Sequence, residues 1–180
     1  MSQPDHPSSA AEARRAFLRH TVATLAYRAG KVLRETPEGY ADLRVGPDSR
    51  TPLEILSHMG DLMTWASSIT EGESRWEPQP APDWESARER FFREIAALDA
   101  ALERADLEQS RPLEVMFQGP IADALTHTGQ LAMLRRLAGV RVRGESYARA
   151  EIVMGRVGPE QRASTAEFDV DASWPKPGDP

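Results

Sequence analysis

The sequence predicts an all-α protein: a four-helix bundle of the up-and-down type, followed by a short C-terminal helix and an irregular tail. Four long segments carry apolar residues at the three- and four-residue spacings of a helix that is buried on one face. The connections between them are rich in proline, glycine and acidic residues, which end helices and form turns. No stretch shows the convincing apolar–polar alternation of a strand, so four packed helices are the expected architecture.

The first two segments have recognisable helix boundaries. The first runs from about Ala10 to Arg34 and ends before Pro37. Its predicted buried face consists of Phe17, Val22, Leu25, Ala29 and Val32. The second begins at Thr51-Pro-Leu-Glu54, which combines a threonine N-cap, a proline at the first helical position and a glutamate placed to complete a capping box, and it should extend to about Thr70. Its predicted buried stripe consists of Ile55, Met59, Leu62, Ala66 and Ile69.

The other two long segments are also bounded by helix signals. The third should run from about Asp83 to Arg104. Its apolar residues follow a heptad-like rhythm of Trp84, Ala87, Phe91, Ile95, Leu98 and Leu102. The fourth should run from about Pro120 to Ala138, because Gly119-Pro120 is a typical helix start and Gly139 occupies a typical C-cap position. A shorter helix is expected from Ser146 to Val153.

The stretch Leu113-Glu-Val-Met-Phe-Gln-Gly-Pro120 closely resembles a processing site used for tag removal, which a picornaviral-type protease cuts between glutamine and glycine. An expression scar normally lies at a terminus, whereas this motif lies inside the chain and leads into the fourth helix. We therefore interpret it as native sequence that forms a loop. Cleavage by such a protease would test whether that loop is exposed.

Length and composition fit one compact domain. The chain has 180 residues, of which 40% are hydrophobic and 28% charged, enough for a sizeable core. We expect a flexible N-terminus over residues 1–9, the bundle domain over residues 10–158 and a C-terminal extension over residues 159–180. The extension is polar, acidic and rich in proline, and Phe168 and Trp174 are its only large apolar anchors.

Charge and cysteine content exclude several kinds of function. The formal net charge is −6 and the pI is about 5.3, which argues against binding to nucleic acids or anionic membranes, because both need a basic face. The absence of cysteine excludes disulfides, thiolate ligands and a thiol nucleophile of the chain's own. Neither a signal-peptide pattern nor an apolar stretch of membrane-spanning length is visible, so the expected location is the cytoplasm.

Three polar residues predict a metal site. Asp123 and His127 are four residues apart in the fourth segment, so their side chains project from one helix face, one turn apart. His58 lies on or beside the buried stripe of the second segment. If these helices are neighbours, the three side chains can bind one divalent ion and leave positions open to water or substrate. The alternative is a polar cluster at the core edge, because acid–histidine pairs at this spacing are common without metal.

Other polar residues near these positions have open roles. Asp61, one turn beyond His58, could be a further ligand, a partner that orients an imidazole, or a solvated carboxylate. Gln130 could hydrogen-bond a bound water or substrate, or contact a neighbouring helix. A cluster of arginines could line an entrance for an anionic substrate, but such residues are also favoured at a helix C-terminus, and they receive no role. This cluster consists of Arg135, Arg136, Arg141 and Arg143.

At this point the sequence resembles the DinB/YfiT-like family of metalloenzymes over most of the chain. The resemblance rests on Leu56-Ser-His58-Met-Gly-Asp61 followed by Trp65, and on Thr126-His-Thr-Gly-Gln130 in a helix that ends with Leu134-Arg-Arg-Leu137. In that family a histidine on the second helix and a His-x-x-x-His pair on a later helix bind a divalent metal. The later histidine is commonly followed by Arg-Gly-Gln, and this chain matches two of those three residues.

One departure from the family pattern concerns the metal. Asp123 stands where the family usually has the first histidine of the pair. The resemblance therefore implies a site formed by His58, Asp123 and His127, with a harder and more anionic ligand set than that of the family. Zinc, nickel, iron and manganese ions all accept such ligands, so the preferred ion stays open.

The resemblance implies a class of chemistry and leaves the substrate open. Relatives include thiol-dependent S-transferases and an isomerase that use low-molecular-weight bacterial thiols. We expect a metal-dependent transferase or hydrolase acting on a small molecule, in which the metal activates a thiol or water and Gln130 or Tyr147 helps to position the electrophile. The alternative is a non-enzymatic helical protein of the stress response that binds a ligand or partner and keeps a vestigial metal site. A homodimer is one expected assembly, and Tyr147 and Glu145 are candidates for a covering segment.

Overall fold

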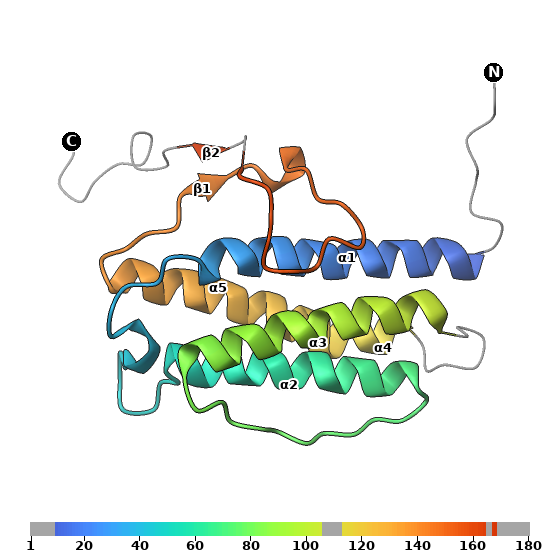
Figure 1. The fold of residues 1–180 in the computed structure, drawn as a ribbon, viewed down its shortest axis with the longest axis horizontal. Helices are drawn as coiled ribbons and strands as arrows, with labels where there is room; N and C mark the ends of the chain where they lie inside the picture. Colours follow the sequence, from blue (N-terminus) through green and yellow to red (C-terminus); the bar gives the residue numbers. More distant parts are fainter. Residues whose placement is uncertain (1–9, 106–112, 165–166, 169–180) are drawn as a thin grey trace.

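The computed structural model describes residues 10–105, 113–164 and 167–168, and the structural statements below refer to these residues. Four helical rods lie side by side (Figure 1). Three of them are α1 (Ala10–Leu33), α2 (Pro52–Thr70) and α3 (Trp84–Arg104). The fourth is a continuous helical run made of α4 (Leu113–Met116), the π-helical turn η2 (Phe117–Ile121) and α5 (Ala122–Leu137). The prediction of an all-α four-helix protein is confirmed.

The connectivity of the bundle includes one long crossover. The segment between α2 and α3, residues 71–83, runs back along α2, so that both helices begin at the same end of the bundle and are parallel (Figure 1). Side chains of α2 hold this crossover: Asp61 Oδ1 accepts a hydrogen bond from the backbone N–H of Gln79 at 2.9 Å, and Ser57 Oγ accepts one from Ala81 at 3.2 Å. The crossover is thereby fixed beside the face of α2 that carries His58.

The buried stripes of α2 and α3 agree with the sequence prediction, and that of α1 differs at one residue. The whole predicted stripe of α2 is buried, and Phe91, Ile95 and Leu98 of α3 are fully buried. In α1 the prediction was wrong for Phe17, whose exposed fraction is 69%. Phe17 lies in the first turns of α1, where it lines a separate apolar cavity with Phe117 instead of entering the core.

The fourth helix begins earlier than the sequence predicted. Helical structure starts at Leu113 rather than Pro120, and the protease-like motif is therefore helical instead of forming a loop. Proline inside an α-helix lacks the N–H and clashes with the preceding turn. Here Pro120 lies in the wider π-helical turn of η2, which is one of the recognised ways for a helix to accommodate such a disturbance. This turn leads directly into the part of α5 that carries Asp123.

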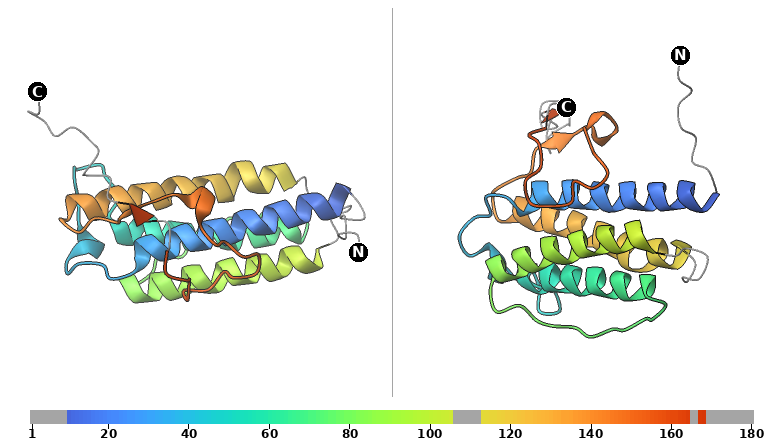
Figure 2. Two further views of the ribbon diagram at one scale, coloured as in Figure 1. Left: turned by 90° about the horizontal axis from the view of Figure 1, so that it is seen from above. Right: turned by 45° about the vertical axis from the view of Figure 1, so that its right-hand side comes forward.

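The C-terminal segment lacks the predicted helix within the described residues and contains two short strands that the sequence did not predict. The helix expected from Ser146 to Val153 is only a 3₁₀ turn, η3 (Tyr147–Arg149). Two short strands, β1 (Gly144–Glu145) and β2 (Glu167–Phe168), pair antiparallel and lie over α1 (Figure 2). Phe168 is half exposed, and Trp174 lies outside the described residues.

Buried polar contacts attach this hairpin to α1. Lys31 Nζ is 2.7 Å from Glu145 Oε2 and 2.8 Å from Glu167 Oε1. The hydroxyl of Tyr27 donates a hydrogen bond of 2.6 Å to Glu145. The hairpin is therefore attached to α1 by charged and hydrogen-bonded groups, whereas Phe168, the one suggested apolar anchor among the described residues, is half exposed. Within the described part of the chain, no helix has both the length and the apolar character that a membrane span needs.

Candidate metal centre

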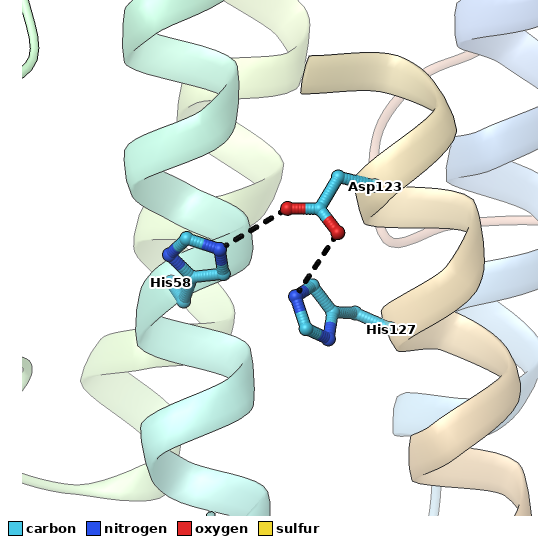
Figure 3. Close-up of side chains that lie close together, drawn as sticks. All are labelled: His58, Asp123 and His127. Carbon is cyan, nitrogen blue, oxygen red and sulfur yellow. Dashed lines mark hydrogen bonds and ion pairs between the residues drawn. The ribbon is translucent and has the colours of Figure 1, made fainter. Parts of the chain in front are cut away.

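Helices α2 and α5 bring the three predicted ligands together (Figure 3). Asp123 lies between the two imidazoles: its Oδ2 is 3.3 Å from Nε2 of His58, and its Oδ1 is 3.4 Å from Nε2 of His127. One donor atom from each residue lies within 4.8 Å of the others. The three side chains thus meet across a helix–helix contact, although His58 is far from the other two in the sequence.

Local helix geometry explains how each ligand is aimed. On α5, Asp123 and His127 are one turn apart and project from the same face. On α2, His58 follows the buried Ile55 by one turn, so its ring lies at the edge of the core. The exposed fraction falls from 45% for the Asp123 side chain to 20% for His58 and 10% for His127. The site is therefore half enclosed, with its carboxylate on the open side.

The donor set fits a divalent transition-metal ion. Two ligands that each lie about 2.1 Å from one tetrahedral ion stand about 3.4 Å apart. The contacts of Asp123 with His58 and His127, at 3.3 Å and 3.4 Å, are close to that separation but involve different carboxylate oxygens, and a set with one donor atom from each residue lies within 4.8 Å. Two imidazole nitrogens and one carboxylate are ligands that zinc, iron, nickel and manganese all accept. Three protein ligands would leave at least one position for a small molecule.

Gln130 orients one of the imidazoles. Its side-chain oxygen Oε1 lies 2.7 Å from Nδ1 of His127. An amide oxygen can only accept a hydrogen bond, so this contact places the ring proton of His127 on Nδ1 and leaves the lone pair of Nε2 directed toward Asp123. That is the tautomer a metal ligand needs. The sequence left open whether Gln130 contacts water or substrate or a neighbouring helix; in the structure its side chain contacts His127 and also lines the cavity.

The surroundings of His58 favour its neutral form. Burial lowers the pKa of His58, the hydrogen bond with Asp123 raises it, and the nearby charges of His127 and Arg50 lower it. The net result is a pKa below the ordinary value of 6.5. The imidazole is therefore unprotonated at neutral pH, as metal binding requires.

Two tryptophans cover the site from the side of the crossover. The ring of Trp76 packs edge-on against His58, with centroids 5.5 Å apart, and Trp65 packs in the same way against Trp76 at 5.7 Å. Trp65 also donates a hydrogen bond of 3.0 Å to Ser74 in the crossover. No motif or spacing in the sequence pointed to Trp76. The one indication in the sequence was that it is an aromatic residue in an otherwise polar connection.

A cavity of about 960 Å³ opens above the three ligands. It is bounded by α2, α5 and the connection that precedes α2. Besides the three ligands, it is lined by Val45, Ser49, Arg50, Ile55, Thr126, Gly129, Gln130, Met133, Leu134 and Leu137. The contribution of residues 45–50 could not be predicted, because no periodicity or motif connects this segment with α5.

Asp61 has a structural contact instead of a position at the metal site. Its carboxylate forms an ion pair of 2.6 Å with Arg90 of α3 and accepts the backbone hydrogen bond of Gln79. Both partners lie on the side of α2 that faces the crossover. The carboxylate of Asp61 thus joins α2, α3 and the crossover. This role differs from all three that the sequence had left open.

Tyr147 and the arginine cluster lie elsewhere. Tyr147 packs edge-on against Tyr27 at 6.3 Å and lies under the guanidinium of Arg28 at 4.1 Å, and it is not among the described residues that line the cavity. Arg135 is buried and donates hydrogen bonds to carbonyl groups at the end of α1. Arg141 and Arg143 line a separate cavity of about 250 Å³.

Comparisons of the chain with protein-family models, with curated proteins and with solved structures found no match. The site is therefore defined by its own geometry. What the structure supports is an all-α protein of four packed helices in which His58, Asp123 and His127 could hold a metal ion.

Proposed function

We propose that this chain is a divalent-metal-binding protein of the DinB type, which acts on a small molecule as a metal-dependent thiol S-transferase or as a hydrolase. One observation carries the proposal: the ligand atoms of His58, Asp123 and His127 converge within 4.8 Å of one another beside a cavity of about 960 Å³. Ligand sites of small-molecule enzymes have cavities of about 300–1,000 Å³ that combine apolar walls with a few polar groups.

The residues of the chain have separate tasks in this proposal. His58 and His127 supply neutral nitrogen ligands, and Asp123 supplies a negative charge that offsets part of the charge of the ion. Gln130 holds His127 in the tautomer that binds metal. A bound divalent ion would supply the chemistry, because it lowers the pKa of a thiol or water molecule that binds to it. Trp76 and Trp65 shield one side of the site from solvent.

The nucleophile must come from outside the chain if the reaction uses a thiol. The sequence has no cysteine, so a thiol group has to be part of a small cofactor or substrate. A low-molecular-weight thiol fits this requirement, and the open side of Asp123 faces the cavity from which it would enter. A hydrolase would instead use water and would show no dependence on added thiol.

Metal uptake is the decisive experiment. The protein would be purified without a chelating tag, freed of metal, and offered zinc, nickel, iron(II) and manganese ions separately. We expect about one ion per chain, with an affinity at least tenfold lower in the Asp123→Ala and His127→Ala variants, because each loses one of three protein ligands. His20→Ala is the matched control, since His20 is an exposed histidine on α1 outside the site.

Two results would separate the proposal from its alternative. If the wild-type protein takes up none of these ions at micromolar concentration, the polar cluster is vestigial and a non-enzymatic binding function replaces the enzyme. If it binds metal and the metal-loaded protein is further stabilised by small thiols but not by matched alcohols, the transferase is favoured over the hydrolase.

A further inference from the structure

The cavity above the three ligands combines polar and apolar lining residues. The large apolar ones are Val45, Ile55, Met133, Leu134 and Leu137. Three of these side chains are unusually exposed: the exposed fraction is 54% for Val45, 59% for Met133 and 61% for Leu137. Large apolar side chains that are exposed together around a cavity commonly mark a ligand-binding surface.

Arg50 adds a positive charge to this cavity. It is the single lysine or arginine among the described residues that line it. Its neighbour in the same connection, Arg44, forms an ion pair with Glu54 at 3.2 Å. No hydrogen bond or ion pair within the described part of the chain engages the guanidinium of Arg50. Arg50 is therefore available to an anion that enters the cavity.

The position of Arg50 defines how far such an anion lies from the metal ligands. Arg50 precedes Thr51, the N-cap of α2, and His58 lies two turns into that helix. The helical rise places His58 about 10 Å along the axis from Thr51. A molecule that spans this backbone separation is extended, with a body of several carbon atoms. The apolar side chains of Met133 and Leu137, on α5, are part of the same cavity and could contact such a body.

Resting on the proposed function, we propose that the molecule bound here is an amphipathic acid, with a metal-binding head at His58, Asp123 and His127, an apolar chain against α5, and an anionic group on Arg50. Arginine suits this role because its planar guanidinium binds a carboxylate or phosphate through two parallel hydrogen bonds. Arg50 would then be a residue that determines specificity, with no part in the chemistry at the metal.

The test uses the cobalt(II)-loaded protein, whose thiolate-to-cobalt absorption band reports a thiol at the metal. Two thiols of equal length are compared: mercaptohexanoate, which ends in a carboxylate, and mercaptohexanol, which ends in a hydroxyl. We expect wild-type protein to bind the acid about tenfold more tightly, as one charge-assisted contact at a half-open site should provide. In Arg50→Ala the two affinities should become equal, and in Arg50→Glu the preference should reverse.

Two controls separate a direct contact from a general effect of charge. Arg136→Ala removes an equally charged, exposed arginine from α5 that does not line the cavity, and it should leave the tenfold preference unchanged. Mercaptopropionate carries its carboxylate close to the sulfur, so its affinity should respond less to Arg50→Ala than that of mercaptohexanoate. Thermal unfolding of the Arg50 variants would show that they are folded, as expected for an exposed residue.

The outcomes are distinguishable. If wild-type protein binds mercaptohexanoate and mercaptohexanol equally, or if the preference survives in Arg50→Ala, the amphipathic-acid proposal is overturned while the metal site stands. An equal response of mercaptopropionate to Arg50→Ala would also overturn it, because it would show a long-range charge effect. If neither thiol produces the absorption band, the thiol-transferase form of the proposed function fails, and this inference fails with it.

Discussion

At the scale of single residues, Asp123 is the group on which the site depends. Each of its two oxygens faces a different imidazole. Asp123, on α5, therefore contacts His58 on α2 and His127 on its own helix through side-chain atoms alone. It is also the most exposed of the three ligands. A carboxylate in this position makes the ligand set harder than one built from three histidines, and this difference should appear in the choice of metal.

Replacing Asp123 by histidine should change the metal preference. The Asp123→His variant has three imidazole ligands, which favour nickel and zinc ions over manganese. We expect the ratio of zinc to manganese affinity to rise by about tenfold or more relative to wild type, measured by competition titration with a metal indicator. An unchanged ratio would show that residue 123 does not bind the ion.

Gln130 should affect metal binding without touching the ion. Gln130→Leu removes the acceptor of the His127 ring proton, and loss of such a partner typically lowers metal affinity by about 10–100-fold. Gln130→Glu keeps an acceptor at the same distance and should retain most of the affinity. If Leu and Glu at this position give equal affinities, the 2.7 Å contact is not what orients His127.

At the scale of the structural elements, the sequence predicted neither the π-helical turn nor the β1–β2 hairpin. The π-helical turn continues α4 into α5 through a proline, and the β1–β2 hairpin packs over α1. Both replace expectations that were based on local signals. Proline-glycine sequences usually mark the start of a helix, and a polar tail usually lacks regular structure. In each case contacts with distant residues decided the outcome.

The native protein should resist cleavage at the protease-like motif. Gln118 is exposed, but the segment from Leu113 to Pro120 is helical, and a protease must bind its substrate in an extended conformation. Cleavage then depends on local unfolding. We expect a synthetic peptide of this segment to be cut at least tenfold faster than the native protein in a time course followed by mass spectrometry. Equal rates would mean that this part of the helix opens readily.

The hairpin should be sensitive to acid. Burial raises the pKa of Glu145, but hydrogen bonds from Lys31, Ser164 and Tyr27 and the charge of Lys31 lower it, and the net pKa is below its ordinary value of 4.5. A carboxylate with a depressed pKa stabilises the fold above its ordinary pKa, and this stabilisation is lost as the pH falls through the folded-state value. The pKa of Lys31 is raised, so its own contribution persists up to alkaline pH and is lost only as the pH rises above its ordinary value of 10.5.

Glu145→Gln tests this contribution. The variant should lower the free energy of unfolding by about 1.5–3 kcal/mol at pH 7, because hydrogen bonds to a charged partner are lost. The difference from wild type should shrink as the pH falls below the ordinary pKa of 4.5 and through the lower folded-state pKa of Glu145. Glu151→Gln is the control, since Glu151 pairs with Arg162 at the surface and should contribute little. If the difference in unfolding free energy between wild type and Glu145→Gln did not change with pH, the charged carboxylate of Glu145 would not be the source of the stabilisation.

At the scale of the whole molecule, the crossover between α2 and α3 determines what surrounds the site. Because α3 begins at the same end as α2, the connecting segment must return along the bundle, and it passes His58 with Trp76. Asp61 and Arg90 hold this path through an ion pair of 2.6 Å. The opposite side of the site stays open to the cavity. The topology thus closes one side of the metal centre and leaves the other accessible.

Metal should stabilise the entire fold. An ion that binds only the folded state at a concentration of 100 times its Kd adds about 2.7 kcal/mol to the free energy of unfolding, because α2 and α5 must be packed to form the site. For a protein of this size that corresponds to a rise in Tm of roughly 5–10 °C. Differential scanning calorimetry should show this rise in wild-type protein and a clearly smaller one in Asp123→Ala. A rise of equal size in both would place the bound ion elsewhere.

The sequence by itself determined the helices that have complete local signals and the identity of the ligand candidates. The capping box of α2 is formed as predicted: Thr51 Oγ accepts from the N–H of Glu54 at 3.2 Å, and Glu54 accepts from the N–H of Thr51 at 2.7 Å. Asp123 and His127 share a helix face because residues four apart always do. These features depend on interactions within a few residues, so the local sequence is sufficient to specify them.

Only the tertiary structure decided what meets these residues. Residues that share no periodicity, such as His58 and Asp123, are brought to 3.3 Å by helix packing. The same packing placed Arg50 in the cavity, Trp76 against His58 and Asp61 against Arg90. Each of these contacts depends on how the helices pack or on the path of a connection. Such features are set by the burial of whole helix faces, and no local sequence pattern specifies them.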